Sequence, residues 1–282
     1  MIKPSLQRRI LHVVSSDSKG LLSKITNMCY RNELNILENN QFVDDDTNLF
    51  FMRTDLEGYF DNNKFLKDLD YVLPIGSRSE LHSLRRQRIV ILASQETHCV
   101  GELLMKSAYN ELDLDIAVVI SNHETLRSLV TCFNIPFIFS NHKSFTRVQH
   151  DNNIADKIDF YCPDYIVLAK YMRVLTEDFV HRYKNKIINI HHSFLPAFIG
   201  SRPYHQAYNR GVKMIGATAH YVNEDLDGGA IIIQDVIPID HSYNPEDMRR
   251  ACRDVEKNVL TRALYQIVTQ RVFLNGNRTI LL

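Results

Sequence analysis

The sequence predicts an α/β protein made of two successive domains, and three observations lead to that prediction. The chain has 282 residues, and at roughly 100–200 residues per domain this length favours two domains. The first part shows the pattern strand–helix–strand–strand–helix. From Ile89 onward, short apolar strands alternate with helices, as in a parallel sheet covered by helices. We therefore expect a small α+β domain over residues 1–84 and a larger, mainly parallel α/β domain over residues 85–282.

The first domain is predicted from short apolar runs that lie between turn signals. Residues 15–20 are polar and include several possible helix N-caps, and the acidic segment 44–48 suits a hairpin turn. Segment 77–88 is polar and basic, so we take it as the linker, with room for one last strand. The expected elements, in order, are a strand at 10–14, a helix at 21–29, strands at 34–43 and 49–56, and a helix at 65–72.

The second domain begins with a nearly continuous apolar run at residues 89–93, which is typical of a strand buried on both faces. Asn244 and Pro245 suit the N-cap and first position of a helix that runs to about residue 268. A final hairpin is expected at 271–282. Between these, we expect strands at 116–120, 136–139, 165–169 and 187–190, helices at 103–108, 124–133 and 148–161, and a hairpin formed by 216–222 and 230–236.

Composition excludes several classes of protein. Lysine plus arginine equals aspartate plus glutamate at 33 each, so the formal net charge is zero, which argues against a nucleic-acid binder held by phosphate contacts. No apolar run approaches the roughly 18 residues that a membrane span needs, and the basic N-terminus lacks the apolar core of a signal peptide. The cysteines are odd in number and form no C-x-x-C pair, so a reducing cytoplasm is the expected location.

The densest group of chemically useful side chains lies between residues 189 and 227. Asn189 and His191 are two positions apart at the end of an expected strand, so both side chains point to one face. Open α/β sheets place their sites at such strand ends, and Asp227 lies in a tight turn before two glycines. An amide can stabilise an oxyanion, while an imidazole and a carboxylate can move protons. The three residues therefore suit transfer or hydrolysis of an acyl group.

Each residue of this group also has a structural interpretation. An Asn-x-His pair is a weak signal by itself, Asp227 suits an ordinary turn, and His192 is expected to be a core residue rather than a second proton carrier. A zinc site is not predicted, because His191, His192, His205 and His220 match neither HExxH nor a cysteine–histidine set.

Taken as one string, this segment resembles the folate-dependent formyltransferase family, and the likeness covers about residues 88–282. The matching elements are Asn189-Ile190-His191, Ser193-Phe194-Leu195-Pro196, and His220 followed by Asp227. The resemblance implies a Rossmann-like domain in which Asn189, His191 and Asp227 are catalytic. It also implies a folate pocket, with no metal or other cofactor because folate is the substrate. The pocket residues implied by the resemblance are Met172, Arg173, Val174, Leu175, His220 and Val222.

The first domain resembles an ACT domain, a ferredoxin-like module that often binds amino acids at subunit interfaces. Residues 16–21 match its ligand loop, although Lys19 stands where the loop usually has proline. The resemblance implies a homo-oligomer and an amino-acid effector, with glycine or methionine as the candidates. The alternative is that the loop merely caps a helix. The effector residues implied by the resemblance are Asp17, Lys19, Gly20 and Leu21, with Asn39 and Asn40 from the strand across from the loop.

An ACT domain ahead of a formyltransferase core is the arrangement of the formyltetrahydrofolate deformylase family, which this chain resembles. The resemblance implies hydrolysis of 10-formyltetrahydrofolate to formate and tetrahydrofolate, which supplies formate for purine biosynthesis and balances one-carbon pools. Segment 94–101 lacks the close glycines of a phosphate-binding turn, and Glu96 would repel a phosphate, so water is favoured over a phosphorylated amine. The alternatives are a formyltransferase acting on a small amine, and a non-catalytic sensor of folate and an amino acid.

Overall fold

The computed structural model describes residues 6–59, 61–198 and 202–282. The chain divides into two compact units. The first runs to Arg85 and also contains Thr269–Phe273 and Ile280–Leu282, while the second comprises Arg86–Val268 and Leu274–Thr279. The sequence placed the whole C-terminal segment in the second domain, so its division between the units differs from the expectation. Residues 199–201, inside the segment that carries the family resemblance, lie outside the described residues.

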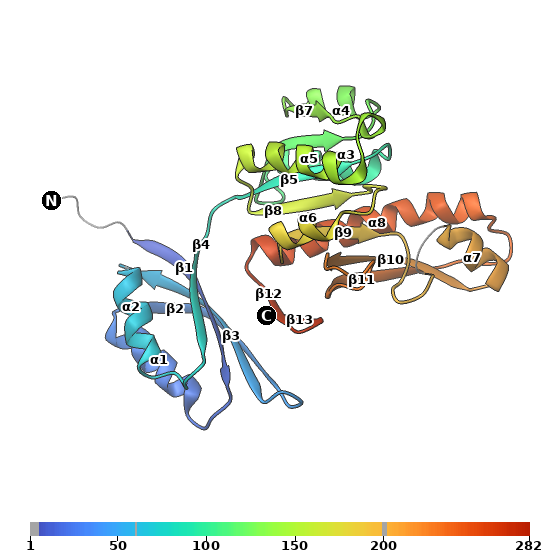
Figure 1. Ribbon diagram of the computed structural model, residues 1–282. Coiled ribbons are helices and arrows are strands. Elements are labelled where there is room, and N and C mark those ends of the chain that lie inside the picture. Colours follow the sequence, from blue (N-terminus) through green and yellow to red (C-terminus); the bar gives the residue numbers. More distant parts are fainter. Residues whose placement is uncertain (1–5, 60, 199–201) are drawn as a thin grey trace. The chain divides into compact units, whose positions relative to one another are not determined.

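The first unit is an antiparallel sheet with two helices on one face, in the order βαββαβ, and this confirms the ferredoxin-like fold (Figure 1). The strands lie in the order β2-β3-β1-β4. The fourth strand occupies the segment that we predicted as a linker with room for one strand. The elements are β1 (Gln7–Ser16), α1 (Leu21–Arg31), β2 (Asn35–Asp44), β3 (Leu49–Gly58), α2 (Asn62–Asp70) and β4 (Arg78–Ser83).

The two faces of this sheet are covered in different ways. Because successive side chains of a strand point to opposite faces, Phe50 and Met52 of β3 pack against Leu21 and Ile25 of α1 in the core. Phe51, between them, points to the other face, where its ring lies 5.8 Å from that of Phe273. The helices thus bury one face, and the segment near the C-terminus covers part of the other.

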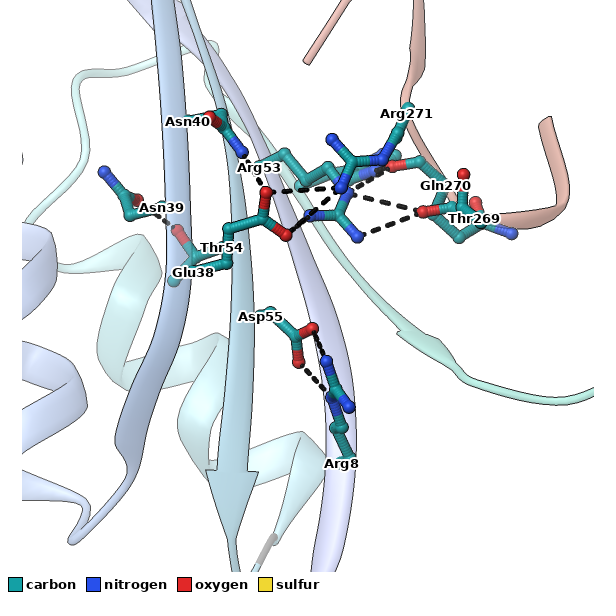
Figure 2. A network of polar contacts seen from close by, with 11 residues as sticks. Arg8, Glu38, Asn39, Asn40, Arg53, Thr54, Asp55, Thr269, Gln270 and Arg271 are labelled. Atoms are coloured by element: carbon teal, nitrogen blue, oxygen red, sulfur yellow. Dashed lines mark hydrogen bonds and ion pairs between the residues drawn. The ribbon is translucent and has the colours of Figure 1, made fainter. Parts of the chain in front are cut away.

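Arg53 holds that C-terminal segment on the sheet, and Figure 2 shows its contacts. The guanidinium is buried and donates hydrogen bonds to the carbonyl oxygens of Thr269 at 3.1 Å and Gln270 at 2.9 Å. It also donates to Glu38 at 3.1 Å, and Arg271 contacts the same carboxylate at 3.2 Å. A buried guanidinium needs such partners. The sequence could not predict this, because a buried cation on β3 and two backbone carbonyls far along the chain leave no shared pattern.

The second unit is built on a seven-stranded sheet in the order β11-β10-β9-β8-β5-β6-β7. Strands β9 to β7 in this order are parallel, and β10 and β11 continue the sheet as an antiparallel hairpin. This confirms the expected mainly parallel α/β domain. The strands are β5 (Gln87–Ala93), β6 (Leu114–Ser121), β7 (Phe137–Phe139), β8 (Tyr165–Ala169), β9 (Ile187–His191), β10 (Met214–Tyr221) and β11 (Ile231–Pro238). A separate two-stranded hairpin of β12 (Val272–Asn275) and β13 (Arg278–Leu281) has residues in both units.

Helices cover this sheet, and two of them were not predicted. Asn244 caps the last helix by accepting from the backbone N–H of Glu246 at 2.8 Å, as its position before Pro245 predicted. The two missed helices, α6 and α7, have only 6 and 8 residues, too few for an apolar stripe to show. The helices are α3 (His98–Ala108), α4 (Arg127–Thr131), α5 (Arg147–Tyr161), α6 (Glu177–Arg182), α7 (Pro203–Arg210) and α8 (Pro245–Val268), with a 3₁₀ turn η1 (His142–Ser144).

The strand order locates the place where a ligand is expected. From β5 the chain continues outward through β6 and β7, then returns to add β8 on the other side of β5. The loops after β5 and β8 therefore diverge, which opens a crevice at the carboxyl ends of these strands. Ser94 follows β5 and Lys170 follows β8, so both lie at this crevice. In the part of the chain that the structure describes, no helix is long and apolar enough to cross a membrane.

Candidate active site

Asn189 and His191 lie on one face of β9, as their spacing predicted. Strand β9 lies between β8 and β10, and its antiparallel pairing with β10 sets Asn189 opposite His220 and His191 opposite Thr218. His191 and His220 are buried, at 5% and 2% exposure. The strand pairing therefore fixes an amide and two imidazoles side by side at the edge where the parallel sheet becomes antiparallel.

The hydrogen bonds of His220 define which of its ring nitrogens carries the proton. Nδ1 lies 2.7 Å from the carbonyl oxygen of Tyr221, and a carbonyl only accepts, so Nδ1 is the protonated nitrogen. Burial lowers the pKa of His220, which favours the neutral ring with a lone pair on Nε2. The Asn189 amide donates to that Nε2 at 3.2 Å. One amide hydrogen is thereby fixed, and the other remains available for a ligand.

His191 and Asp227 form the central pair of the site. Nδ1 of His191 lies 3.2 Å from a carboxylate oxygen of Asp227, whose side chain is 10% exposed. Burial alone would raise the pKa of Asp227, but the hydrogen bond from His191 and the nearby imidazoles bring it below its usual value. The carboxylate is therefore ionised and orients the His191 ring. Nε2 of His191 is buried and has no hydrogen-bond partner among the described residues.

The turn that carries Asp227 depends on close packing against β10. Asp227 itself has a left-handed backbone conformation, with φ at 56°, which aspartate and asparagine tolerate better than most residues. A side chain at Gly229 would place its first carbon 1.8 Å from the carbonyl oxygen of Tyr221. Only glycine permits this approach, and it brings the turn over the end of the strand where His191 lies.

A cavity of about 480 Å³ opens in front of these groups. This cavity is lined by all the residues predicted to be catalytic or folate-binding: Asn189, His191, Asp227, Met172, Arg173, Val174, Leu175, His220 and Val222. The apolar wall is less closed than expected, because the side chains of Met172 and Val174 are more than half exposed and only Leu175 is buried. These exposed side chains exclude water only when a ligand covers them.

His192 has a different position from the core site that the sequence favoured. Its ring lies 5.1 Å from that of His191 and 5.8 Å from that of Tyr204, measured between centroids, and it lines two cavities. Burial, followed by the charges of Lys170 and His191, lowers its pKa to about 3. A ring that is neutral near pH 7 can accept a hydrogen bond but supplies no cationic proton donor.

The predicted effector residues lie in the first unit, where the structure separates them into two groups. Asp17 and Lys19 are exposed beside Gly20, whose φ of 78° precedes α1, whereas the Leu21 side chain is buried in the core. Asn39 accepts from Thr54 at 2.6 Å, and Asn40 donates to Glu38 at 2.9 Å (Figure 2). As neighbours on β2, the two asparagines point to opposite faces of the sheet, so both side chains cannot line one pocket on one face.

The sequence missed a second group of buried polar side chains in the second unit. Glu256 of α8 is 1% exposed and contacts His98, Lys170 and Tyr204. A signal was present, because Glu256 lies four residues from Cys252 and from Leu260 on the buried stripe of its helix. The expectation that Glu96 would repel a phosphate also changes, since its carboxylate pairs with Arg249 and Arg253.

One cluster has the residue types of a metal site: the potential ligand atoms of His98, Cys99 and Glu256 lie within 4.8 Å of one another. Two features oppose metal binding there. Burial raises the pKa of the Cys99 thiol well above its usual value, so the thiolate that metals require is disfavoured. The Lys170 ammonium already lies 3.0 Å from the Glu256 carboxylate, where it would repel a cation.

Comparisons with known proteins match both units. A model of the Formyl transferase family matches residues 87–264. The formyltetrahydrofolate deformylase of Escherichia coli strain K12 is 64% identical over 278 residues, which cover 99% of this chain and 99% of that protein. A crystal structure of a formyltetrahydrofolate deformylase from Pseudomonas syringae pv. tomato matches with a TM-score of 0.91 at 36% identity, covering 99% of this chain and 95% of that one. Glycinamide ribonucleotide transformylase 1 from Symbiobacterium toebii matches with a TM-score of 0.66 at 27% identity, covering 74% of this chain and 100% of that one.

Proposed function

The chain belongs to the formyltetrahydrofolate deformylase family, and from this membership we propose that it hydrolyses 10-formyltetrahydrofolate to formate and tetrahydrofolate. The observation that carries the proposal within the molecule is the unpartnered Nε2 of His191, a residue that lines the cavity with Asn189 and whose Nδ1 contacts the Asp227 carboxylate. An imidazole nitrogen without a partner, on a residue that lines a cavity, is suited to exchange a proton with a bound molecule. The formate would be available to purine biosynthesis.

In the proposed reaction, His191 is the general base. Water attacks the formyl carbon while Nε2 of His191 takes one of its protons, and the ionised Asp227 stabilises the imidazolium that forms. The bond between the formyl carbon and the folate nitrogen then breaks. The proton held on His191 passes to that nitrogen, so the products are formate and tetrahydrofolate.

Asn189 is proposed as the oxyanion donor. One hydrogen of its amide is used on His220, which fixes the plane of the group, and the other can donate to the oxygen of the formyl group as it becomes negative. The pterin would lie along Met172, Arg173, Val174 and Leu175, with His220 and Val222 on the opposite wall. Binding would then bury Met172 and Val174, and the site would become drier as the substrate enters.

The proposed reaction requires no metal or other resident cofactor, because a general base and an oxyanion donor suffice for water to attack a formyl group. The formal charge of zero gives no reason to expect a nucleic-acid partner. All five cysteines are free, which supports the reducing cytoplasm as the proposed location.

Regulation by an amino acid remains a proposal for the first unit, with glycine and methionine as candidates. Asp17, Lys19 and Gly20 are exposed at the loop, and Leu21 would contribute its backbone rather than its buried side chain. Asn39 lies on the sheet face that packs against α1, so its side chain remains a candidate effector ligand. Asn40 lies on the opposite face, so it is proposed to contribute only the backbone of its strand. Strand β2 is an edge of its sheet with Leu37 and Phe42 exposed, which supports pairing of two copies in a homo-oligomer. Calorimetry with each amino acid tests the effector, and light scattering tests the assembly.

The decisive experiment supplies the purified protein with 10-formyltetrahydrofolate and no amine. We expect formate and tetrahydrofolate to appear in equal amounts. A formyltransferase would release neither without an acceptor, and a non-catalytic sensor would bind the folate without turnover.

A further inference from the structure

A second cavity of about 790 Å³ lies beside the proposed folate cavity, and the two share part of their walls. Met172, Arg173, His192 and Arg202 line both. The second cavity opens at the crevice between β5 and β8, where Ser94 and Lys170 follow the strands. A water molecule occupies only about 30 Å³ in the liquid. The second cavity, which adjoins the proposed folate cavity, is therefore many times larger than a water nucleophile requires.

The wall of this second cavity includes the buried carboxylate of Glu256. One oxygen lies 2.6 Å from Nε2 of His98, and the other lies 3.0 Å from both Nζ of Lys170 and the hydroxyl of Tyr204. Burial alone would raise the pKa of Glu256, but Lys170 and His98 lower it to about 2. An ionised carboxylate in a cavity wall is the natural partner of an ammonium group. In this protein that ammonium is supplied by the chain itself.

Lys170 holds this position at a cost to its backbone. Its φ is 60°, in the left-handed region that disfavours residues other than glycine. The side chain is also buried, with the residue 6% exposed, although lysine is almost never fully buried unless it is paired. Glycine would suit the backbone better. The contact with Glu256 is the interaction that offsets both costs.

The same cavity wall contains a second ion-paired group, in which two guanidinium groups share one carboxylate. Glu96 contacts Arg249 at 2.9 Å and Arg253 at 3.0 Å, one guanidinium on each carboxylate oxygen. Two guanidinium groups close together form a common site for phosphate or carboxylate. Here their shared anion is again a side chain of the protein. The cavity thus has the groups to hold a molecule with an ammonium and an anionic end, and both sets are already paired internally.

We propose that Lys170 determines the specificity of the enzyme for water: its ammonium group occupies the carboxylate of a cavity that would otherwise bind a primary amine. This inference rests on the hydrolysis proposed above. Glu96 contributes in the same way by occupying Arg249 and Arg253. Water can enter the remaining space and reach the formyl carbon, whereas the described carboxylates of this wall, Glu96, Glu246 and Glu256, already have cationic partners and are not free to hold an amine.

Removal of the Lys170 side chain should therefore allow formyl transfer. In that reaction the amine nitrogen forms a bond to the formyl carbon, and the bond from that carbon to the folate nitrogen breaks. One proton moves from the amine to the folate nitrogen through His191, so the products are an N-formyl amine and tetrahydrofolate. No oxidant, reductant or further reactant is needed.

The test is a Lys170→Gly variant, supplied with 10-formyltetrahydrofolate and glycinamide, a small amine that is partly unprotonated near neutral pH. Wild-type protein should release equal amounts of tetrahydrofolate and formate at every glycinamide concentration. In the variant, tetrahydrofolate should exceed formate, and the difference should appear as N-formylglycinamide in mass spectrometry. We expect the fraction transferred to rise by about tenfold or more over wild type, because specificity is a difference of affinities. Glycinamide should also raise the melting temperature of the variant but not of the wild type.

Two control variants identify the responsible interaction. Lys170→Arg keeps the charge and should behave as wild type, while Lys170→Gly combined with Glu256→Gln should lose the gain, since the carboxylate is gone. Equal product amounts and an unchanged melting temperature in Lys170→Gly would overturn the inference, as would an equal gain in the double variant. If the glycine variant does not accumulate as folded protein, Lys170→Ala carries the same two measurements. Absence of formate from wild type without amine would instead overturn the proposed hydrolysis, and the melting temperatures would still decide the role of Lys170.

Discussion

In the second unit, a half-buried carboxylate, Asp227, and a buried one, Glu256, line neighbouring cavities and have partners of different kinds. Asp227 lies 3.2 Å from an imidazole, that of His191, and its side chain is 10% exposed. Glu256 lies 3.0 Å from the ammonium of Lys170 and 2.6 Å from His98, and its side chain is 2% exposed. An imidazole can act as a general base, whereas the Lys170 ammonium pairs with the Glu256 carboxylate as a fixed counter-charge.

This difference suits the Asp227 pair to the chemical step and the Glu256 group to the choice of substrate. The Asp227 pair can exchange a proton during a reaction, because His191 lines the cavity and its second nitrogen has no hydrogen-bond partner among the described residues. The Glu256 group is closed by Lys170, His98 and Tyr204, so it is suited to set which molecule enters. Substitution of Asp227 should therefore affect rate, and substitution of Glu256 should affect stability and specificity.

The largest expected effect is the loss of activity in Asp227→Asn. Asparagine fits the left-handed backbone at this position but cannot stabilise a protonated His191. We expect the rate of formate release to fall roughly 10³–10⁴-fold, as when an orienting carboxylate becomes an amide in a comparable triad. Asp225→Asn removes a charge from the same turn without touching the His191 pair and is the matched control. An Asp227→Asn variant with near-normal turnover would refute its role.

Asn189→Ala is expected to lower the rate by roughly 10²–10³-fold, the usual cost of removing one oxyanion donor. The substitution leaves the His191–Asp227 pair intact, so it separates oxyanion stabilisation from proton transfer on the same strand. Steady-state kinetics should show the loss in kcat. If only KM rose, Asn189 would bind substrate without stabilising the transition state.

Glu256→Gln should lower the free energy of unfolding, whereas Asp227→Asn should lower the reaction rate. The substitution leaves the Lys170 ammonium buried without an opposite charge, which typically costs about 3–5 kcal/mol. Thermal unfolding measures the loss. Addition of Lys170→Met in a double variant removes the stranded charge and should recover most of that stability. If the two substitutions were simply additive, the pair would not be coupled as the structure indicates.

The smallest expected effect is a pH dependence of stability that arises from His192, which lies between the two groups. Its pKa is lowered from 6.5 to about 3 on folding, so unfolding at lower pH takes up a proton. Its contribution is complete above about pH 6.5 and is lost as the pH falls toward about 3. The melting temperature should drop between about pH 7 and about pH 5, and by about 2–4 °C less in a His192→Gln variant. Parallel curves for the two proteins would contradict a neutral His192.

The sequence was sufficient for the fold class and for the position of the proposed catalytic group. Asn189 and His191 share a face because a strand has a period of two, and Asp227 follows in a turn that Gly229 allows to pack closely against Tyr221. The Lys170–Glu256 pair was not predictable, because it joins a loop and a helix 86 positions apart. The short helices α6 and α7 were missed for lack of periodicity. The place of Thr269–Phe273 depends on backbone carbonyls, which every residue has.

The contact of Arg53 with Thr269 and Gln270 has a consequence for biosynthesis. Strands β1 to β4 leave the ribosome before the carbonyl groups that pair with the buried Arg53 guanidinium, because those groups lie 216 and 217 positions later in the chain. During most of translation this face of the first unit lacks both that pairing and the cover of Phe273 over Phe51. A nascent domain that waits for a distant segment exposes apolar surface and is open to misassembly. The sheet of β1 to β4 therefore stays uncovered on one face until residues Thr269–Phe273 have been synthesised. A chaperone could shield that face during this interval.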